Sequence, residues 1–299
     1  MSVVVIINPI SGPARRGNAA TRVDLAARTL ERLGVQGQVR LTERGGHAHE
    51  LALEAARTGA GLVIAWGGDG TVNEVGRALL QFAEAGEGPA PALGLIPGGS
   101  GNGLSRELGI PFDPAQAIER AVRSPSRRID AGELGERMFF NAGGVGLDAH
   151  VAALVSTRAN HRGLLPYLKA GARDLVRYRP TEYVVVADGQ TSTVCALLIA
   201  LANSKQWGFG AAIAPAASPT DGWLEMVIVE DRKVLGNLAR LPSLFLHRID
   251  RQDGITTIRV REATIRSSGP LLFHIDGEAV QGADSLSARV HPNALAIRA

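Results

Sequence analysis

A glycine-rich turn near residue 70 is the strongest candidate for chemistry in this chain. It reads, in order, Gly67, Gly68, Asp69, Gly70, Thr71, Val72 and Asn73. Glycines let the backbone turn sharply and let anionic oxygens approach its N–H groups, and a helix N-terminus attracts phosphate. Asp69 is the one charge in the turn, and it suits Mg²⁺ or a Mg²⁺-bound water better than a phosphate, which it would repel. The turn predicts a phosphate and Mg²⁺ site; the alternative is an ordinary strand-to-helix turn.

Two further loops have a similar character. Residues 97–103 are rich in glycine and include Ser100, and the other loop comprises Asn8, Pro9, Ile10, Ser11 and Gly12. Each of the three loops follows a short apolar run. If those runs are neighbouring parallel strands, the loops share one sheet edge and can cradle a polyphosphate through backbone N–H groups. No lysine precedes Lys169, which excludes a Walker-A lysine in the first half.

A pair of carboxylates, Asp276 and Glu278, is the best candidate for a general base. They follow an apolar run that ends at Ile275. If the strand continues through Gly277, both side chains lie on one face, where mutual repulsion would raise one pKa toward the operating pH. We favour Glu278 as the base, with Asp276 in support or sharing the role. The alternative is a polar turn between surface strands.

The elements that must position these residues differ between the two halves of the chain. In residues 1–130, short β-branched runs alternate with amphipathic stretches, which is typical of a parallel sheet covered by helices. Thr71 and Glu74 have capping-box spacing and indicate a helix start there. Residues 131–299 contain closely spaced strands and two helical insertions, at about 162–177 and 233–246, and they predict a mainly antiparallel, sandwich-like domain. The boundary is expected between residues 127 and 135.

Composition and length exclude several classes of protein. The chain has 299 residues, a net charge of +3 and one cysteine, Cys195, which we expect in the core. The small net charge does not call for a nucleic-acid partner. No apolar run reaches the 18 residues of a membrane span, and the first residues look like a strand rather than a signal peptide, so we expect a cytoplasmic protein. Residues 158–179 form a basic amphipathic stretch, and residues 238–251 repeat the pattern; each suits either a membrane surface or a helix packed on the domain.

The ordered motifs resemble those of the diacylglycerol kinase catalytic family, which includes bacterial diacylglycerol kinases and sphingosine and ceramide kinases. They read NPISG, GGDGTVNEV, LGLIPGGSGNGLSRELGIP, FFNAGGVGLDAHV, PTDGWLEMVIV and HIDGE. The resemblance covers nearly the whole chain in the right order. It implies a lipid kinase with a phosphofructokinase-like α/β domain, a β-sandwich-like domain, and ATP and a lipid head meeting between them. The partner it implies is a lipid at the inner membrane face; a homodimer is also possible under it.

The resemblance also implies roles for individual residues. ATP would contact residues 8–12, Thr42, residues 67–73 and Ser100. Asp69 would organise the catalytic Mg²⁺ through water, Asp130 matches an acidic position of that network, and the DGE motif would accept the proton. A second, structural metal would be held at Ser218, Asp221 and Trp223, whose alternative is a plain Asp-Gly turn.

The acceptor lipid stays open at this point. Gly103 stands where many glycerolipid kinases of the family carry Asp, whereas GSGN followed by a small residue resembles the sphingosine kinases. We expect a kinase for diacylglycerol or a related lipid, with a sphingoid base or ceramide kinase as the alternative. An NAD kinase-like phosphotransferase and a noncatalytic lipid-binding protein are more distant alternatives.

Overall fold

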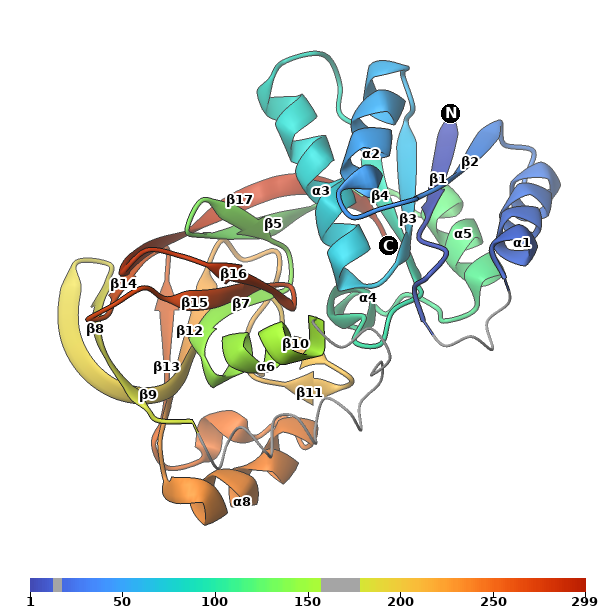
Figure 1. Ribbon diagram of the computed structural model, residues 1–299. Coiled ribbons are helices and arrows are strands. Elements are labelled where there is room, and N and C mark those ends of the chain that lie inside the picture. The colour runs from blue at the N-terminus through green and yellow to red at the C-terminus, as the bar shows by residue number, and fades with distance from the viewer. Residues whose placement is uncertain (13–17, 157–177) are drawn as a thin grey trace. The chain divides into compact units, whose positions relative to one another are not determined.

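A computed structural model describes residues 1–12, 18–156 and 178–299, and the chain folds into two compact units. Unit 1 comprises Met1–Ile129 and Asn293–Ala299, and unit 2 comprises Asp130–Pro292. The two units are described separately below, with the element labels of Figure 1.

Unit 1 is a parallel sheet with helices on both faces. The strand order is β2-β1-β3-β4, all parallel. β1, β3 and β4 are buried along their whole length, as expected for apolar runs covered on both sides. Helix α2 packs beside α3, and α1 packs beside α5 (Figure 1). The bounds are β1 Val3–Ile7, α1 Ala19–Arg32, β2 Gly37–Leu41, α2 His47–Arg57, β3 Leu62–Gly67, α3 Asp69–Glu84, β4 Ala92–Pro97, α4 Gly103–Glu107 and α5 Pro114–Arg123.

The end of the chain returns to this sheet. Strand β17 (Ser285–Arg298) pairs with unit 2 strand β14 through its first residues, but its last residues lie parallel to β4, with Ile297 opposite Leu93. The second half was expected to form one continuous domain to residue 299, and the pattern of apolar residues gave no sign of this return.

Unit 2 is built from antiparallel pairs. One path of the sheet runs β16-β15-β7-β9-β8-β14-β17, and β12 pairs with β9 and with β13. The bounds are β5 Ser126–Leu134, β6 Arg137–Phe139, β7 Ala142–Gly146, α6 Leu147–Ser156, β8 Thr181–Ala187, β9 Gln190–Ala202, β10 Gln206–Gly208, β11 Ala211–Ala212, β12 Leu224–Glu230, α8 Lys233–Phe245, η2 Ile249–Arg251, β13 Ile255–Val260, β14 Glu262–Arg266, β15 Leu272–Ile275 and β16 Glu278–Gln281.

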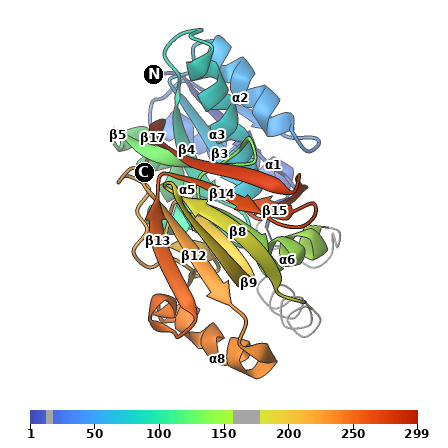
Figure 2. The ribbon, with the colours of Figure 1, turned by 90° about the vertical axis from the view of Figure 1, so that its left-hand side faces the viewer.

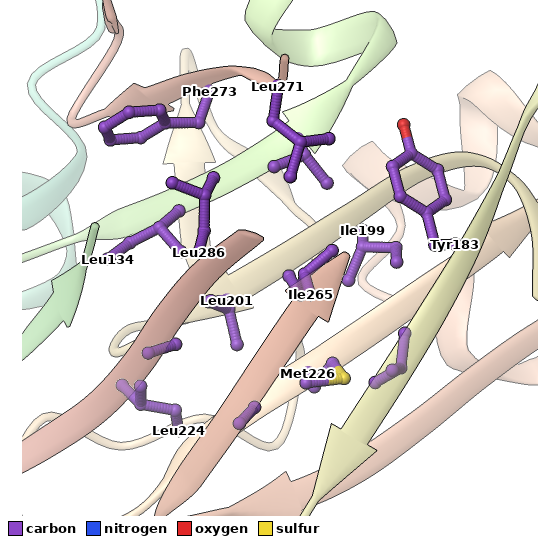
Figure 3. Packing of buried hydrophobic residues seen from close by; sticks show 14 of the residues in the cluster. Leu134, Tyr183, Ile199, Leu201, Leu224, Met226, Ile265, Leu271, Phe273 and Leu286 are labelled. Atoms are coloured by element: carbon purple, nitrogen blue, oxygen red, sulfur yellow. The ribbon is translucent and has the colours of Figure 1, made fainter. Parts of the chain in front are cut away.

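The core of unit 2 lies between the inward faces of these strands. Figure 3 shows Ile199 and Leu201 of β9, Met226 of β12, Ile265 of β14 and Phe273 of β15 meeting in one apolar cluster. Figure 2 shows the same strands from the side. A parallel-stranded α/β unit followed by an antiparallel, sandwich-like unit is the fold class that the sequence predicts.

Some expectations fail in the details. Cys195 is exposed, because the first residues of the long strand β9 extend into solvent and only its second half is buried. The helix expected near 162–177, and most of the basic stretch 158–179, lie outside the described residues. Among the residues that are described, no helix is long and apolar enough to cross a membrane.

Candidate functional site

The three loops of unit 1 meet at one edge of the parallel sheet. They follow β1, β3 and β4, which are adjacent strands. The Asn8 Nδ2 donates to the Thr71 Oγ1 at 3.1 Å, and the Gly98 N–H donates to the Gly67 carbonyl at 2.7 Å. The carboxyl ends of parallel strands are where such sheets bind ligands. The convergence predicted from the sequence is therefore present in the geometry.

The loops after β3 and β4 touch backbone to backbone. A Cβ added at Gly99 would lie 2.4 Å from the Cα of Gly68. Because the obstructing atom belongs to the main chain, it cannot rotate away as a side chain would. Only glycine at position 99 permits this close approach of the two main chains.

Asp69 links the loop at 67–73 to the loop at 97–103. It is the first residue of α3, and its two oxygens accept the N–H groups of Asn102 and Gly103, each at 2.8 Å. Asp69 thus shapes the loop as well as supplying a negative charge. A carboxylate offers about four acceptor sites, so these two bonds alone do not saturate it.

The surroundings of Asp69 are compatible with a hydrated Mg²⁺. In the described part of the chain, no group of three or more His, Cys, Asp or Glu side chains is arranged to hold a metal ion. Mg²⁺ usually keeps several waters and binds through one or two carboxylates plus substrate phosphates. A single half-buried carboxylate beside N–H-rich loops fits a water-mediated contact rather than a protein cage.

Arg22 of α1 is a cation that the sequence analysis did not single out. Its guanidinium donates to the Asn8 carbonyl at 3.1 Å and to the Ser11 carbonyl at 2.8 Å, and it lies 5.9 Å from the Trp66 ring centroid. The side chain is buried. It therefore places a fixed positive charge behind the loop at 8–12, in a half of the chain that has no lysine. In the sequence, the one sign of this contact is that Arg22 lies in the first turn of the helix that follows the loop at 8–12.

The other predicted nucleotide contacts have varied environments. Thr42 is buried and its N–H donates to the Ile7 carbonyl, while Ile10 is exposed at the tip of the first loop. Val72 and Asn73 are buried on α3. Ser100 is half-buried.

The capping box expected at Thr71 and Glu74 is absent. Helix α3 begins at Asp69, with Gly68 as its N-cap residue. The Glu74 carboxylate instead accepts the N–H groups of Gly46 and Ala48 at the start of α2, each at 3.0 Å. A glutamate was correctly associated with a helix N-terminus, but the helix is a different one.

The DGE motif is a hairpin turn and not a continuing strand. β15 ends at Ile275, β16 begins at Glu278, and these two residues pair with each other. Asp276 and Gly277 between them have φ of 47° and 85°, as a two-residue type I′ turn requires. The period-two argument for a shared face was therefore wrong, because it assumed extended backbone at Gly277.

The two carboxylates of this hairpin have different environments. Asp276 is half-buried and accepts three N–H groups, from Phe140 at 3.0 Å, Asn141 at 2.9 Å and Ala142 at 3.1 Å. It anchors the turn to the start of β7. Glu278 is exposed. Asp276 therefore has the environment of a positioning residue, and Glu278 has the accessibility that a base needs.

Asp130 and the 218–223 turn form a second polar cluster, within unit 2. Asp130 is fully buried; its carboxylate accepts the Gly222 N–H and its own N–H donates to the Pro219 carbonyl, both at 2.7 Å. These bonds hold the 218–223 turn, and the part of Asp130 in a hydrated Mg²⁺ network stays a prediction.

The same turn is a poor fit for the structural metal expected at Ser218, Asp221 and Trp223. The Asp221 Oδ2 lies 2.6 Å from the Arg259 Nη2, and its Oδ1 accepts the Trp223 N–H at 3.1 Å. The Ser218 hydroxyl lies 3.2 Å from that of Thr220. A guanidinium already neutralises Asp221 and would repel a divalent cation beside it. The metal role of these residues stays a prediction.

Comparison with known proteins identifies the family. Residues 2–134 match the diacylglycerol kinase catalytic domain, and residues 142–299 match the YegS C-terminal NAD kinase beta sandwich-like domain. A curated relative from Chromohalobacter salexigens, named "Probable lipid kinase YegS-like", is 34% identical over 87% of this chain and 83% of its own length. The chain belongs to the diacylglycerol kinase family of lipid kinases.

Further relatives agree with this family assignment. A protein from Salmonella heidelberg named "Probable lipid kinase YegS" is 31% identical over 89% of this chain and 87% of its own. The fold of the kinase is also that of a crystal structure of a diacylglycerol kinase from Bacillus anthracis, with a TM-score of 0.75 and 20% identity over 99% of this chain and 96% of the other. The protein is thus a lipid kinase, and the NAD kinase-like and noncatalytic alternatives are set aside.

Proposed function

We propose that this lipid kinase transfers the γ-phosphoryl group of ATP to a hydroxyl of diacylglycerol or a related lipid at the inner membrane face. The observation that carries the proposal is the convergence of the loops after β1, β3 and β4 around Asp69. Phosphoryl transfer needs mainly positioning and charge neutralisation, which backbone N–H groups and a fixed cation can supply.

The nucleotide contacts in this proposal come from unit 1. Those backbone N–H groups of the loops at 8–12, 67–73 and 97–103 that are not already bonded to Asp69 or within the loops would bind the phosphate oxygens. Arg22 would supply positive charge from behind the loop at 8–12. Mg²⁺ held through water at Asp69 would neutralise further charge on the triphosphate. No lysine is needed for this arrangement.

The base in this proposal is Glu278. Its carboxylate would accept the proton of the lipid hydroxyl while that oxygen bonds to the γ-phosphorus and the bond from phosphorus to the ADP oxygen breaks. Asp276 would keep the hairpin in place through its three bonds to the start of β7. The exposure of Glu278 supports this division, since a base must reach the acceptor hydroxyl.

Substitution of Glu278 tests the assignment. We expect Glu278→Gln to reduce kcat by a factor on the order of 100 or more, the usual contribution of a general base, while the unfolding temperature stays unchanged because the side chain is exposed. Transfer of labelled phosphate from ATP is the measurement. Glu262→Gln, another exposed strand glutamate of unit 2, is the matched control. A rate for Glu278→Gln within a few-fold of the unsubstituted enzyme would contradict the role of base.

The acceptor is identified by the same assay over several lipids. Monoacylglycerol, diacylglycerol, sphingosine and ceramide, together with NAD, separate the glycerolipid proposal from the sphingoid base and ceramide alternative. Preferential labelling of sphingosine or ceramide would overturn the diacylglycerol assignment without affecting membership of the family. A homodimer and the lack of a nucleic-acid partner stay predictions.

A further inference from the structure

Helix α8 exposes most of its apolar residues and buries the polar residues Asn237, Arg240 and Ser243, while Leu244 packs into the core. Leu235 is 84% exposed, Leu246 just beyond the helix end is 65% exposed, and Phe245 is 42% exposed. Every exposed residue from Leu235 to Leu246 is apolar; the set is Leu235, Leu238, Ala239, Pro242, Phe245 and Leu246. Their spacing of three and four residues places them along one stripe of the helix. A helix packed only for stability shows the reverse arrangement.

The buried side of α8 holds this orientation. Arg240 donates to the Glu230 carbonyl at 2.8 Å and to the Asp253 carbonyl, and Asn237 donates to the Asp231 carboxylate at 2.6 Å. All of these partners lie in unit 2. If the helix turned to bury Leu235 and Leu238, Arg240 would lose both carbonyls, and an unpaired buried guanidinium is costly. The apolar stripe is therefore a fixed feature of the surface.

The stripe also has the shape of an element that lies flat on a lipid surface. From Leu235 to Leu246 the helical rise amounts to about 17 Å, too short to cross a bilayer. Pro242 has no N–H to donate to the carbonyl of Leu238, and such a carbonyl is tolerated near the headgroups, where water is present, but not in hydrocarbon. In the chain, α8 follows β12 and precedes β13, and Figures 1 and 2 show it at the edge of unit 2.

Basic residues flank the stripe at both ends. Arg232 and Lys233 precede it and Arg248 and Arg251 follow it, all exposed, against three exposed acids at positions 231, 250 and 253. The cations suit the headgroup level beside an apolar surface. Because the net charge of the segment is small, apolar contact and not electrostatic attraction must supply most of the binding.

We propose that the exposed face of α8 docks this kinase on a lipid bilayer. The proposal rests on the proposed function, which requires the enzyme to reach a lipid acceptor, and it names the surface that makes the contact. Leu235 and Phe245 are the anchors, and the flanking cations lie among the headgroups.

The test is flotation with phosphatidylcholine vesicles, with and without phosphatidylglycerol. We expect the double variant Leu235→Ser with Phe245→Ser to lower vesicle partitioning by on the order of tenfold or more, since two exposed apolar side chains lose their contact with lipid. Phe112→Ser, at a phenylalanine that is 38% exposed in unit 1, is the matched control and should bind as the unsubstituted enzyme does. Salt should weaken binding only modestly.

A second measurement separates docking from catalysis. With the lipid acceptor in vesicles, the double variant should lose turnover in parallel with binding, whereas with a short-chain acceptor dispersed in water its kcat should be unchanged. Vesicle binding equal to that of the unsubstituted enzyme would overturn the docking proposal and leave the kinase assignment intact. Binding that depends on α8 in an enzyme that labels no lipid would support docking and overturn the proposed function. A change in self-association without a change in vesicle binding would overturn the proposal in favour of a second copy as the occupant.

Discussion

Asp69 has one role that the structure shows and a second that the proposed function gives it. It holds the loop after β4 through the N–H groups of Asn102 and Gly103, and it places negative charge where a hydrated Mg²⁺ would bind. The first function needs two acceptor oxygens, whereas the second needs the charge. A substitution that keeps the size but removes the charge and one acceptor should affect both.

We therefore expect Asp69→Asn to lower the free energy of unfolding by about 1–2 kcal/mol and to reduce kcat by a factor on the order of 100. The amide retains one acceptor oxygen, so the protein should still fold. Urea unfolding and the labelled-ATP assay are the two measurements. Asp24→Asn, at an exposed residue of α1, is the control and should change neither. If kcat falls no further than the change in folded fraction explains, Asp69 is a loop anchor alone.

Arg22 shows why part of the site was not predictable from single residues. An arginine on an amphipathic helix is normally a solvated side chain, and no motif surrounds this one. Its role arises because α1 packs over the first loop and buries the guanidinium against the carbonyls of Asn8 and Ser11. The loops themselves were predictable, because glycines and small polar residues directly after apolar runs mark strand ends.

At the scale of elements, most strands could be predicted from the sequence, but the turn at Asp276 and the start of α3 could not. Strands β1 (Val3–Ile7) and β13 (Ile255–Val260) lie on short apolar or β-branched runs, as the alternation of such runs with turn residues predicts. Asp276 and Gly277 form a hairpin and not the continuing strand on which the shared face depended, in keeping with Asp-Gly as a strong hairpin signal between two strands. The start of α3 was placed too late because Glu74 caps α2, which is a tertiary contact.

Within unit 2, the Glu133 carboxylate of β5 contacts two basic side chains of β17, and the stability that it contributes depends on pH. Glu133 accepts from the Arg289 Nε at 2.8 Å and lies 2.7 Å from the His291 Nε2. Burial alone would raise the pKa of Glu133, but the hydrogen bonds from Arg289 and His291 outweigh burial and leave its pKa below the ordinary value of 4.5. A lowered pKa means that the carboxylate stabilises the fold fully above that ordinary value and loses the effect as the pH falls through the folded-state pKa.

We expect Glu133→Gln to reduce the free energy of unfolding by about 1 kcal/mol at neutral pH, a modest figure because Arg289 is largely exposed. In acid below the folded-state pKa, the variant and the unsubstituted protein should converge. Urea unfolding across a pH series measures the difference. Glu182→Gln, at an exposed residue of β8, should show no such pH dependence. A gap that persists in acid would mean that the contact acts through packing rather than charge.

For the molecule as a whole, the chain passes from unit 1 to unit 2 near residue 129 and returns near residue 293. Unit 1 is therefore not a simple N-terminal half, since its sheet includes the last residues of the chain. A fragment ending at residue 129 would leave β4 paired with β3 but without its other neighbour, β17. The sequence does not show that the last residues belong to unit 1. The returning residues, such as Leu295 and Ile297, have the same alternating pattern as the rest of β17.

The return of β17 to the sheet of unit 1 predicts that its last residues stabilise β4, which can be measured. Ile297 is fully buried beside β4, and Ile297→Ala should reduce the stability of unit 1 by about 2–5 kcal/mol. Native-state hydrogen exchange followed by mass spectrometry reports on each unit, and we expect faster exchange in β3 and β4 with no change in β12. Ile265→Ala in the core of unit 2 is the reciprocal control. If Ile297→Ala accelerates exchange equally in both units, they unfold as one cooperative body, and the chain that crosses between them twice transmits the loss of a single side chain to the whole enzyme.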